Sequence, residues 1–326
     1  MSEDYLGVDV GGTKIASAIL RDAELAVQAV QATDSDLSEA LIEEILSSVS
    51  VVQTDETAAI GIGVPSVVEW KTGRARTSVN VPLTDVPLRQ VLGERTGLPV
   101  FVDNDANLAA LAEAFDGDEL VVRNLVMFTV GTGVGGGLVL DGRPYRGATG
   151  AAAELGHTLI GFDPGAPVPG AQEFPQPQSL ERAAAGTALD RLAAAAAAEH
   201  PDSYLGERVA AGERVNGVDA VAGAKAGDPA AVRAVELLGE RLGIGIANAI
   251  NTFDPDVVAI GGGVSVAGDL LLEPARRVAR QYVLPGVGEA TEIRLSNHGP
   301  EAGVLGAALL AKLESTGAYG SSERER

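Results

Sequence analysis

Alternating apolar and polar positions predict a strand meander at the start of the chain. Residues 5–10 (YLGVDV), 14–20 (KIASAIL) and 25–30 (LAVQAV) have the period of two that is typical of strands, with a glycine turn between the first two. Residues 35–49 instead place apolar side chains at helical spacing behind a capping aspartate or serine. The chain therefore opens as a meander followed by a helix.

Two further strands are predicted to end at the edge of a sheet. Residues 58–65 (AAIGIGVP) and 99–103 (PVFVD) are apolar runs, separated by a helix over residues 84–97 that ends at Gly97. The second run continues directly into a helix that opens with the residues NDAN. Polar residues between a strand and a helix lie at the carboxyl edge of the sheet, where α/β proteins bind ligands.

The strand and glycine pattern restarts about 120 residues after its first occurrence. Residues 124–130 (NLVMFTV), 131–137 (GTGVGGG) and 138–145 (LVLDGRPY) again read as strand, glycine turn and strand. Two such patterns predict two similar lobes, each opening with a hairpin whose turn faces a shared cleft. The predicted class is α/β.

Helical periodicity dominates the second half of the chain. Helices are predicted near 179–199 and 228–252, the latter with Asp228 as its N-cap and Pro229 in its first turn. A strand and glycine turn follow at 256–265. We expect a small lobe over residues 1–117, a larger α/β lobe over 118–300, a closing helix at about 301–315 that packs back on the small lobe, and a disordered tail over 316–326.

Composition narrows the class of protein further. The chain has 326 residues, no cysteine and a net charge of -21, so disulfides, thiolate zinc sites and a cysteine nucleophile are excluded. The acidic charge argues against a nucleic-acid partner, and no apolar run approaches the length of about 20 residues that spans a membrane. Only four of the 24 basic residues are lysine, and the acidic residues are scattered along the chain, a surface typical of a protein from a salty cytoplasm, where salt screens a high net charge. We expect a cytoplasmic protein.

Three glycine clusters follow apolar strands, at 11–12, 131–137 and 261–263. Glycines there let backbone N–H groups approach a phosphate, although each cluster alone could simply form a tight turn. GTGVGG matches the dinucleotide fingerprint GxGxxG, but the residues that follow it predict a strand and hairpin rather than the required helix. No Gly-Lys pair is present, so the P-loop pattern is excluded. The residues favour a nucleotide held between two lobes by hairpin turns.

The order GVDVGGTK, VDNDANLAALAE, GTGVGGGLVLDG, ELGH and AIGGGVS resembles the ROK family (repressors, open reading frames and sugar kinases), in particular its glucokinases. The resemblance implies an actin-like ATPase (ribonuclease H-like) fold of two lobes with a central cleft for sugar and ATP. It implies ATP-dependent phosphorylation of a hexose at its 6-hydroxyl, most readily glucose. It also implies a homodimer or homotetramer.

Phosphoryl transfer to a sugar hydroxyl needs a base. The residues alone leave this role and the capping of the following helix open among Asp103, Asn104 and Asp105. The resemblance implies that Asp105 is the base and that Asn104 binds the sugar, whereas Asp103 stands where many members have glutamate. The same resemblance implies sugar contacts from the residues Asn80, Glu154, His157 and Glu181.

The resemblance also places the nucleotide. It implies that Gly11, Gly12, Thr13 and Lys14 lie near the terminal phosphates, with Thr132 and Gly133 opposite them and Gly262 near the adenosine. Magnesium usually keeps several water ligands and is coordinated by the phosphates, and Asp9 is its expected partner through water.

In the family, the histidine of ExGH and three cysteines bind a structural zinc. This chain has Gln172, Phe174 and Ser179 at the cysteine positions, so we predict no zinc and a proline-stiffened loop that holds Glu181 and His157. Two alternatives to a glucokinase stay open: a kinase for fructose, mannose, N-acetylmannosamine or N-acetylglucosamine, and a ROK-type sugar-sensing regulator. The regulator is disfavoured because no room for a DNA-binding segment precedes the first strand.

Overall fold

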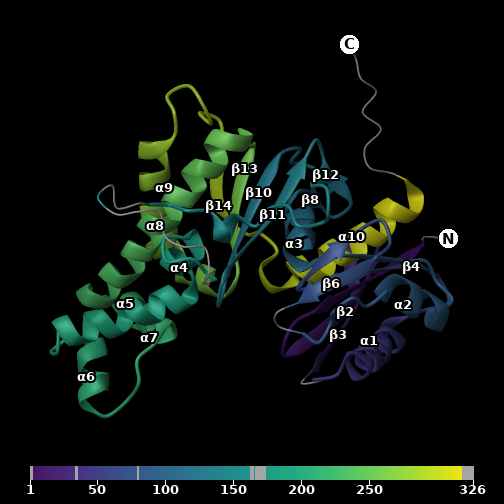
Figure 1. Ribbon diagram of the computed structural model, residues 1–326, viewed down its shortest axis with the longest axis horizontal. Coiled ribbons are helices and arrows are strands. Elements are labelled where there is room, and N and C mark those ends of the chain that lie inside the picture. Colours follow the sequence, from purple (N-terminus) through teal and green to yellow (C-terminus); the bar gives the residue numbers. More distant parts are fainter. Residues whose placement is uncertain (1–2, 34–35, 79–80, 162–164, 166–173, 318–326) are drawn as a thin grey trace. The chain divides into compact units, whose positions relative to one another are not determined.

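The computed structural model describes residues 3–33, 36–78, 81–161, 165 and 174–317 (Figure 1). The chain divides into unit 1 (Met1–Met127, Gly137–Ala153 and Asn297–Arg326) and unit 2 (Phe128–Gly136 and Glu154–Ser296). The chain passes from one unit to the other after residues 127, 136, 153 and 296.

The first sheet belongs to unit 1 and has the strand order β3-β2-β1-β4-β7. Its strands are β1 (Asp4–Val10), β2 (Lys14–Arg21), β3 (Glu24–Ala32), β4 (Thr57–Val64) and β7 (Val100–Asn104). β1 is antiparallel to β2 and parallel to β4, and β4 is parallel to β7. Asp9 is in register with Gly63, which is in register with Asp103. The carboxyl ends of the three parallel strands therefore meet at one edge of the sheet.

Helices cover both faces of this sheet (Figure 1). Helix α1 (Ser38–Val52) packs on β1, β2 and β3, while α10 (Ala302–Thr316) packs on β1 and β4 and against α3 (Asp105–Glu113). Gly61 permits the close approach of α10, since a Cβ atom there would lie 1.8 Å from the carbonyl oxygen of Ala307. Helix α2 (Leu88–Thr96) ends at Gly97 in the left-handed conformation, as predicted.

Two short hairpins in unit 1 were not predicted from the sequence. They are β5 (Ser66–Glu69) with β6 (Arg74–Ser78), and β8 (Phe115–Asp116) with β9 (Glu119–Leu120). Trp70, the only tryptophan of the chain, directly follows β5.

The second sheet has the order β12-β11-β10-β13-β14. Its strands are β10 (Leu125–Val130), β11 (Val134–Leu140), β12 (Arg143–Pro144), β13 (Val257–Gly261) and β14 (Glu292–Leu295). Only residues 131–133 of the glycine-rich segment form the turn, because β11 already begins at Val134. Gly137 lies within β11 and lets α3 approach, since a Cβ atom there would lie 2.3 Å from the carbonyl oxygen of Ala106. Part of the predicted phosphate turn is thus a packing feature of the strand.

Helices make up most of the described part of unit 2. They are η1 (Leu155–His157), α4 (Leu180–Ala184), α5 (Gly186–Glu199), α6 (Tyr204–Ala210), α7 (Gly217–Lys225), α8 (Pro229–Phe253), η2 (Gly263–Ala267) and α9 (Asp269–Tyr282). The short helix η3 (Gly299–Glu301) belongs to unit 1. Asp228 caps α8, accepting a hydrogen bond from Ala231 N at 2.8 Å, as predicted. The predicted helix over 179–199 is two helices, because Ala185 is extended and Gly186 N donates to Gly131 O at 2.7 Å.

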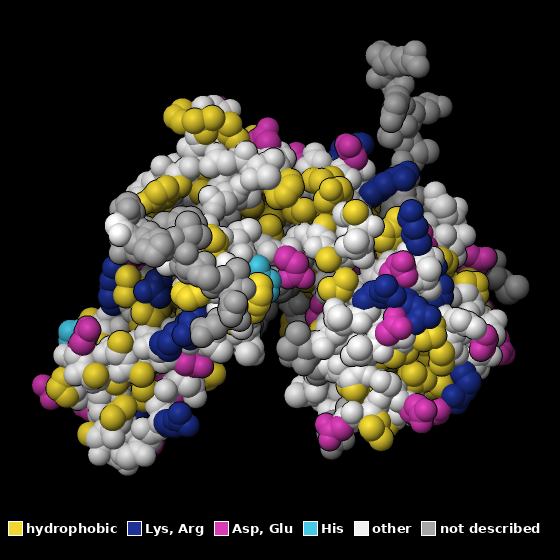
Figure 2. All heavy atoms as spheres, in the orientation of Figure 1, with side chains coloured by type: hydrophobic (Ala, Val, Ile, Leu, Met, Phe, Trp, Pro, Cys, Tyr) yellow, Lys and Arg dark blue, Asp and Glu magenta, His cyan; other side chains and the backbone are white. Residues whose placement is uncertain are grey.

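The surface carries the strong acidic excess. On the face that Figure 2 shows, basic side chains lie singly or in small groups among acidic ones. Among the described residues, no helix has both the length and the apolar character needed to cross a membrane. Residues 318–326 of the expected tail, and also Asn80 and Gln172, lie outside the described residues.

Candidate active site

The glycine turn between β1 and β2 presents exposed polar groups. Gly11 N donates to Lys14 O at 2.8 Å, which closes the turn around Gly12 and Thr13. Gly12, Thr13 and Lys14 are all exposed. A hydroxyl, an ammonium group and glycine backbone thus lie together at the sheet edge, which is the chemistry that binds phosphate.

Asp9 lies beneath this turn with its carboxylate against the first turn of α10. A Cβ atom on Gly303 would lie 2.5 Å from Asp9 Oδ2, and one on Gly63 would lie 3.6 Å from Asp9 Oδ1 and 3.7 Å from the Cα of Asp105. Burial, and after it the negative charge of Asp105, raise the pKa of Asp9 to about 6, while Lys14 opposes the shift. Asp9 and Asp105 therefore interact, and a cation between them would favour their ionised forms.

The turn from β7 into α3 separates the roles that the sequence left open. Asn104 is the N-cap of α3, since its side-chain oxygen accepts from Ala106 N at 2.9 Å and from Asn107 N at 3.2 Å. Asp105 is the first residue of the helix itself, and its carboxylate also accepts from Ala106 N. Capping is therefore mainly the work of Asn104.

Asp103 is almost completely buried, at 2% exposure, and its carboxylate is engaged on both oxygens. Oδ1 accepts from Asn104 N at 2.8 Å and from Asn107 Nδ2 at 3.1 Å, and Oδ2 accepts from Arg146 Nε at 2.5 Å. These contacts assign Asp103 to holding the turn.

In unit 2, the glycine turn at 131–133 is held by the starts of α4 and α5. Val134 N donates to Glu181 Oε2 at 2.8 Å, and a Cβ atom on Gly133 would lie 2.3 Å from the same oxygen. Thr187 Oγ1 donates to the carbonyl oxygen of Thr132 at 3.3 Å. Glu181 therefore contacts the phosphate-side turn, a contact that the sequence did not suggest.

Glu154 and His157 flank the short helix η1, Glu154 as its N-cap and His157 as its last residue. Their side chains approach to 3.9 Å, between Glu154 Oε2 and His157 Nε2. Phe174 makes an edge contact with the His157 ring, with centroids 5.8 Å apart and planes at 79°. Backbone hydrogen bonds then tie the segment after His157 to the segment before Glu181, from Leu180 N to Thr158 O and from Ile160 N to Gln178 O.

A hollow of about 610 Å³ in unit 2 begins at Gly131 and Thr132. Its walls include Val218 and Val266, which are 78% and 60% exposed, and the polar side chains of Asp190 and Lys225. Apolar walls beside a phosphate-type turn suit a flat nucleobase. Most of these side chains come from α5, α7 and η2, and none of the residues from these three helices was predicted as a site residue.

Gly262 lies beside this hollow, next to Gly263 and Val264 of its wall. Its φ of 85° and ψ of 174° suit only glycine. A Cβ atom would lie 2.5 Å from the carbonyl oxygen of Val130. The residue is thus required by the backbone of the turn after β13.

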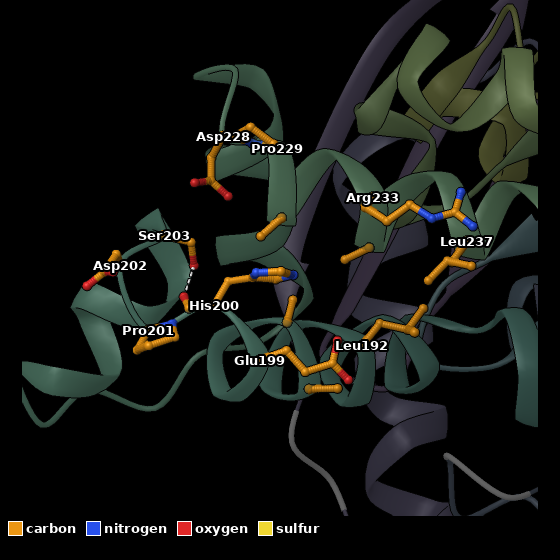
Figure 3. Close-up of a pocket in the computed structure, with 14 residues that line it drawn as sticks. Leu192, Glu199, His200, Pro201, Asp202, Ser203, Asp228, Pro229, Arg233 and Leu237 are labelled. Carbon is orange, nitrogen blue, oxygen red and sulfur yellow. Dashed lines mark hydrogen bonds between the residues drawn. The ribbon is translucent and has the colours of Figure 1, made fainter.

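Another hollow of about 660 Å³ lies between α5, the segment 200–203 and the first turns of α8 (Figure 3). His200 and Asp228 line it, but the carboxylate of Asp228 accepts from Tyr204 N and Ala231 N, as a cap would. None of the predicted site residues lines this hollow. It is therefore not the candidate active site.

The two sheets, the two glycine turns and the acidic β7–α3 turn define an α/β protein of the actin-like ATPase class. A family model described as the ROK family matches residues 5–314, and the chain belongs to this family. The predicted fold class is confirmed.

Similar proteins are known from sequence and structure. A glucokinase of Halalkalibacterium halodurans is 36% identical over 330 residues, covering 98% of each chain. The structure of a ROK family glucokinase from Streptomyces griseus in complex with glucose and AMPPNP aligns with a TM-score of 0.79 and 31% identity, covering 95% of this chain and 99% of that one. A ROK hexokinase from Thermus thermophilus aligns with a TM-score of 0.73 and 35% identity, covering 96% and 99%.

Proposed function

We propose that this chain is an ATP-dependent glucokinase, which transfers the terminal phosphoryl group of ATP to the 6-hydroxyl of glucose. The observation that carries the proposal is the β7–α3 turn. Asn104 caps the helix, and Asp105 follows it beside Gly63 and Asp9. The similarity to glucokinases over nearly the whole chain supports glucose as the acceptor.

Each unit contributes part of the chemistry. In unit 1, Asp105 accepts the proton of the sugar hydroxyl and Asn104 orients the sugar, while Gly11, Gly12, Thr13 and Lys14 bind the terminal phosphates. In unit 2, Glu154, His157 and Glu181 contact the sugar hydroxyls, Thr132 and Gly133 contact phosphate, and Gly262 shapes the adenosine side. Asn80 is proposed as a further sugar contact.

The carboxylate of Asp9 offers the kind of oxygen ligand that a magnesium ion carried by ATP prefers. Among the described residues, no cluster of three or more His, Cys, Asp or Glu side chains could hold a metal. Asp9 is a partly buried carboxylate whose raised pKa a cation would lower, so we assign it to Mg²⁺ through water. Magnesium neutralises charge on the phosphates when bound.

We extend the proposal to the setting of the enzyme. A net charge of -21 and four lysines support a halophilic cytoplasm, and glucose phosphorylation would place the enzyme at the entry to glycolysis. We propose a homodimer or homotetramer that binds neither DNA nor membranes, and that holds no zinc.

One panel of assays tests the proposed function. The purified protein, with ATP and Mg²⁺ at high salt, is offered glucose, fructose, mannose, N-acetylglucosamine and N-acetylmannosamine. Glucose should give the highest kcat/KM. A preference for another hexose would replace the substrate, and no turnover with any of them would refute the kinase assignment.

A substitution tests the base. Asp105→Asn should lower kcat by at least about 100-fold while largely keeping sugar binding, because the base would be lost. Asp116→Asn, an exposed substitution of the same kind in unit 1, is the control and should be close to wild type. Near-normal turnover of Asp105→Asn would contradict its assignment.

A further inference from the structure

A buried arginine connects the β7–α3 turn to the last turn of α10. Arg146 lies in the loop after β12, and its side chain is 10% exposed. Its Nε donates to Asp103 Oδ2 at 2.5 Å and its Nη2 donates to Glu314 Oε1 at 3.1 Å. Two nitrogens of one guanidinium thus donate to two carboxylates from different elements.

Trp70 completes this contact. The guanidinium carbon of Arg146 lies 5.2 Å from the centre of the Trp70 ring. The segment after β5 is itself fixed, because Arg89 donates from Nη2 to Trp70 O and from Nη1 to Lys71 O, both at 2.8 Å. Arg146 is therefore held by its contact with the ring as well as by its hydrogen bonds.

The ion pair of Arg146 with Asp103 lies next to residues that the proposed reaction uses. Asp103 Oδ1 accepts from the backbone N of Asn104, the residue that caps α3, and from the side chain of Asn107 one turn further along. The position of the Asp103 carboxylate therefore sets how the chain enters α3, and with it where the first helical residue, Asp105, points. Movement of about 1 Å at a catalytic group can lower a rate by about 100-fold.

Helix α10 supports both functional turns of unit 1. Its first turn lies against the Asp9 carboxylate at Gly303, and its last turn carries Glu314, which binds Arg146. An acidic side chain near the carboxyl end of a helix is disfavoured by the helix dipole. The ion pair with Arg146 gives Glu314 a compensating partner at this position.

We propose that Asp103 and Arg146 are positioning residues for Asp105, and that Glu314 and Trp70 hold Arg146 in place for this task. The inference rests on the proposed kinase function. Arg146 does not touch the reacting atoms, and it acts through Asp103 on the turn that carries Asp105. Lysine cannot replace it, because one ammonium group cannot bond to two carboxylates in the fixed geometry of the guanidinium.

Kinetics test this role with a matched pair of variants. Arg146→Ala should lower kcat by about 10- to 100-fold, with a smaller change in the KM for glucose. Arg146→Lys should recover only part of the loss. Arg143→Ala removes the same charge from an exposed position in the same hairpin and should stay close to wild type. Rates are taken per folded protein, at a temperature at which circular dichroism shows each variant to be folded.

A comparison of a single and a double variant tests whether Asp103 and Arg146 act together, apart from the cost of an unpaired buried charge. Arg146→Gln alone removes the cation that hydrogen-bonds to the buried Asp103 carboxylate, which is costly in a buried place. The double variant Asp103→Asn with Arg146→Gln provides a neutral amide pair, and its kcat should exceed that of Arg146→Gln. Equal kcat values of the single and double variants would contradict a coupling between the two side chains.

Trp70 offers a readout that needs no activity. Arg146→Ala should move its emission to longer wavelength, since the ring loses its cover, while Arg143→Ala should leave the emission unchanged. If Arg146→Ala does not fold, Glu314→Gln is measured instead and should lower kcat and alter the emission in the same directions.

The outcomes distinguish this inference from the proposed function. Wild-type protein that phosphorylates none of the sugars would refute the function. An active wild type, with Arg146→Ala as fast as Arg143→Ala, would refute only the positioning role. With Glu314→Gln as the substitute variant, wild-type kcat and emission would likewise refute it.

Discussion

Removing the charge of Asp9 should stabilise the metal-free protein while it impairs catalysis. The perturbation is Asp9→Asn, which keeps the size of the neutral side chain. In the folded state, burial and the charge of Asp105 raise the pKa of Asp9 from 3.8 to about 6. Because the folded pKa is higher than the unfolded one, the ionised carboxylate is disfavoured by folding, and its cost grows as pH rises from 3.8 to 6.

The magnitude follows from the shift. At 1.36 kcal/mol for each pKa unit, the cost above pH 6 is about 3 kcal/mol, and at pH 5 it is about 1.5 kcal/mol. Asp9→Asn should therefore raise the free energy of unfolding by up to about 3 kcal/mol at pH 8 and by about half as much at pH 5. The gain should vanish well below pH 3.8, where both states hold the proton.

The assay is denaturant unfolding in the presence of a chelator, followed by the fluorescence of Trp70. This is the only tryptophan of the chain and lies in unit 1 together with Asp9. Asp116→Asn controls for the general effect of removing one negative charge, and should change stability by less than about 0.5 kcal/mol. An Asp9→Asn variant that is no more stable than this control at pH 8 would refute the reasoning, and so would a gain that does not depend on pH.

Three other outcomes are expected. Gly61→Ala should destabilise unit 1 by about 3 kcal/mol, because its Cβ atom would meet the carbonyl oxygen of Ala307 in α10. The control Gly93→Ala makes only ordinary contacts and should be neutral. Equal unfolding midpoints of the two variants would contradict the close packing of α10. Glu181→Ala should raise the KM for ATP by about tenfold, because the hydrogen bond from Val134 N is lost. Glu181→Gln keeps an acceptor oxygen and should recover most of the lost affinity for ATP. ATP kinetics that do not distinguish the two variants would argue against this contact. Metal analysis of the purified protein should find no stoichiometric zinc, and one tightly bound zinc per chain would overturn that prediction.

Local signals in the sequence were sufficient for much of the fold. The period of two located the strands of both hairpins, Asp228 and Pro229 marked the start of α8, and Gly97 marked the end of α2. Such features depend on residues close together in the chain. The break at Ala185 does not, because it depends on the hydrogen bond from Gly186 N to Gly131 O, 55 residues earlier. Helix periodicity alone therefore predicted one helix where there are two.

In the candidate active site, too, the sequence predicted features that depend on neighbouring residues but not those that depend on distant ones. The sequence located the β7–α3 turn, but it could not decide which polar residue caps the helix, since Asp and Asn have similar capping preferences. The contacts around Arg146 join residues 43 and 168 positions apart, and no local pattern predicts such pairs. The exposed valines beside Thr132 were likewise missed, because Val218 and Val266 become neighbours of that turn only in the folded unit.

The most direct test of the account is the product formed from glucose and ATP. The purified wild-type protein should convert glucose to glucose 6-phosphate, with one ADP released for each sugar phosphorylated, and Asp105→Asn should abolish nearly all of this turnover. ATP hydrolysis that does not depend on any hexose, or a wild-type protein that forms no sugar phosphate, would contradict the central claim.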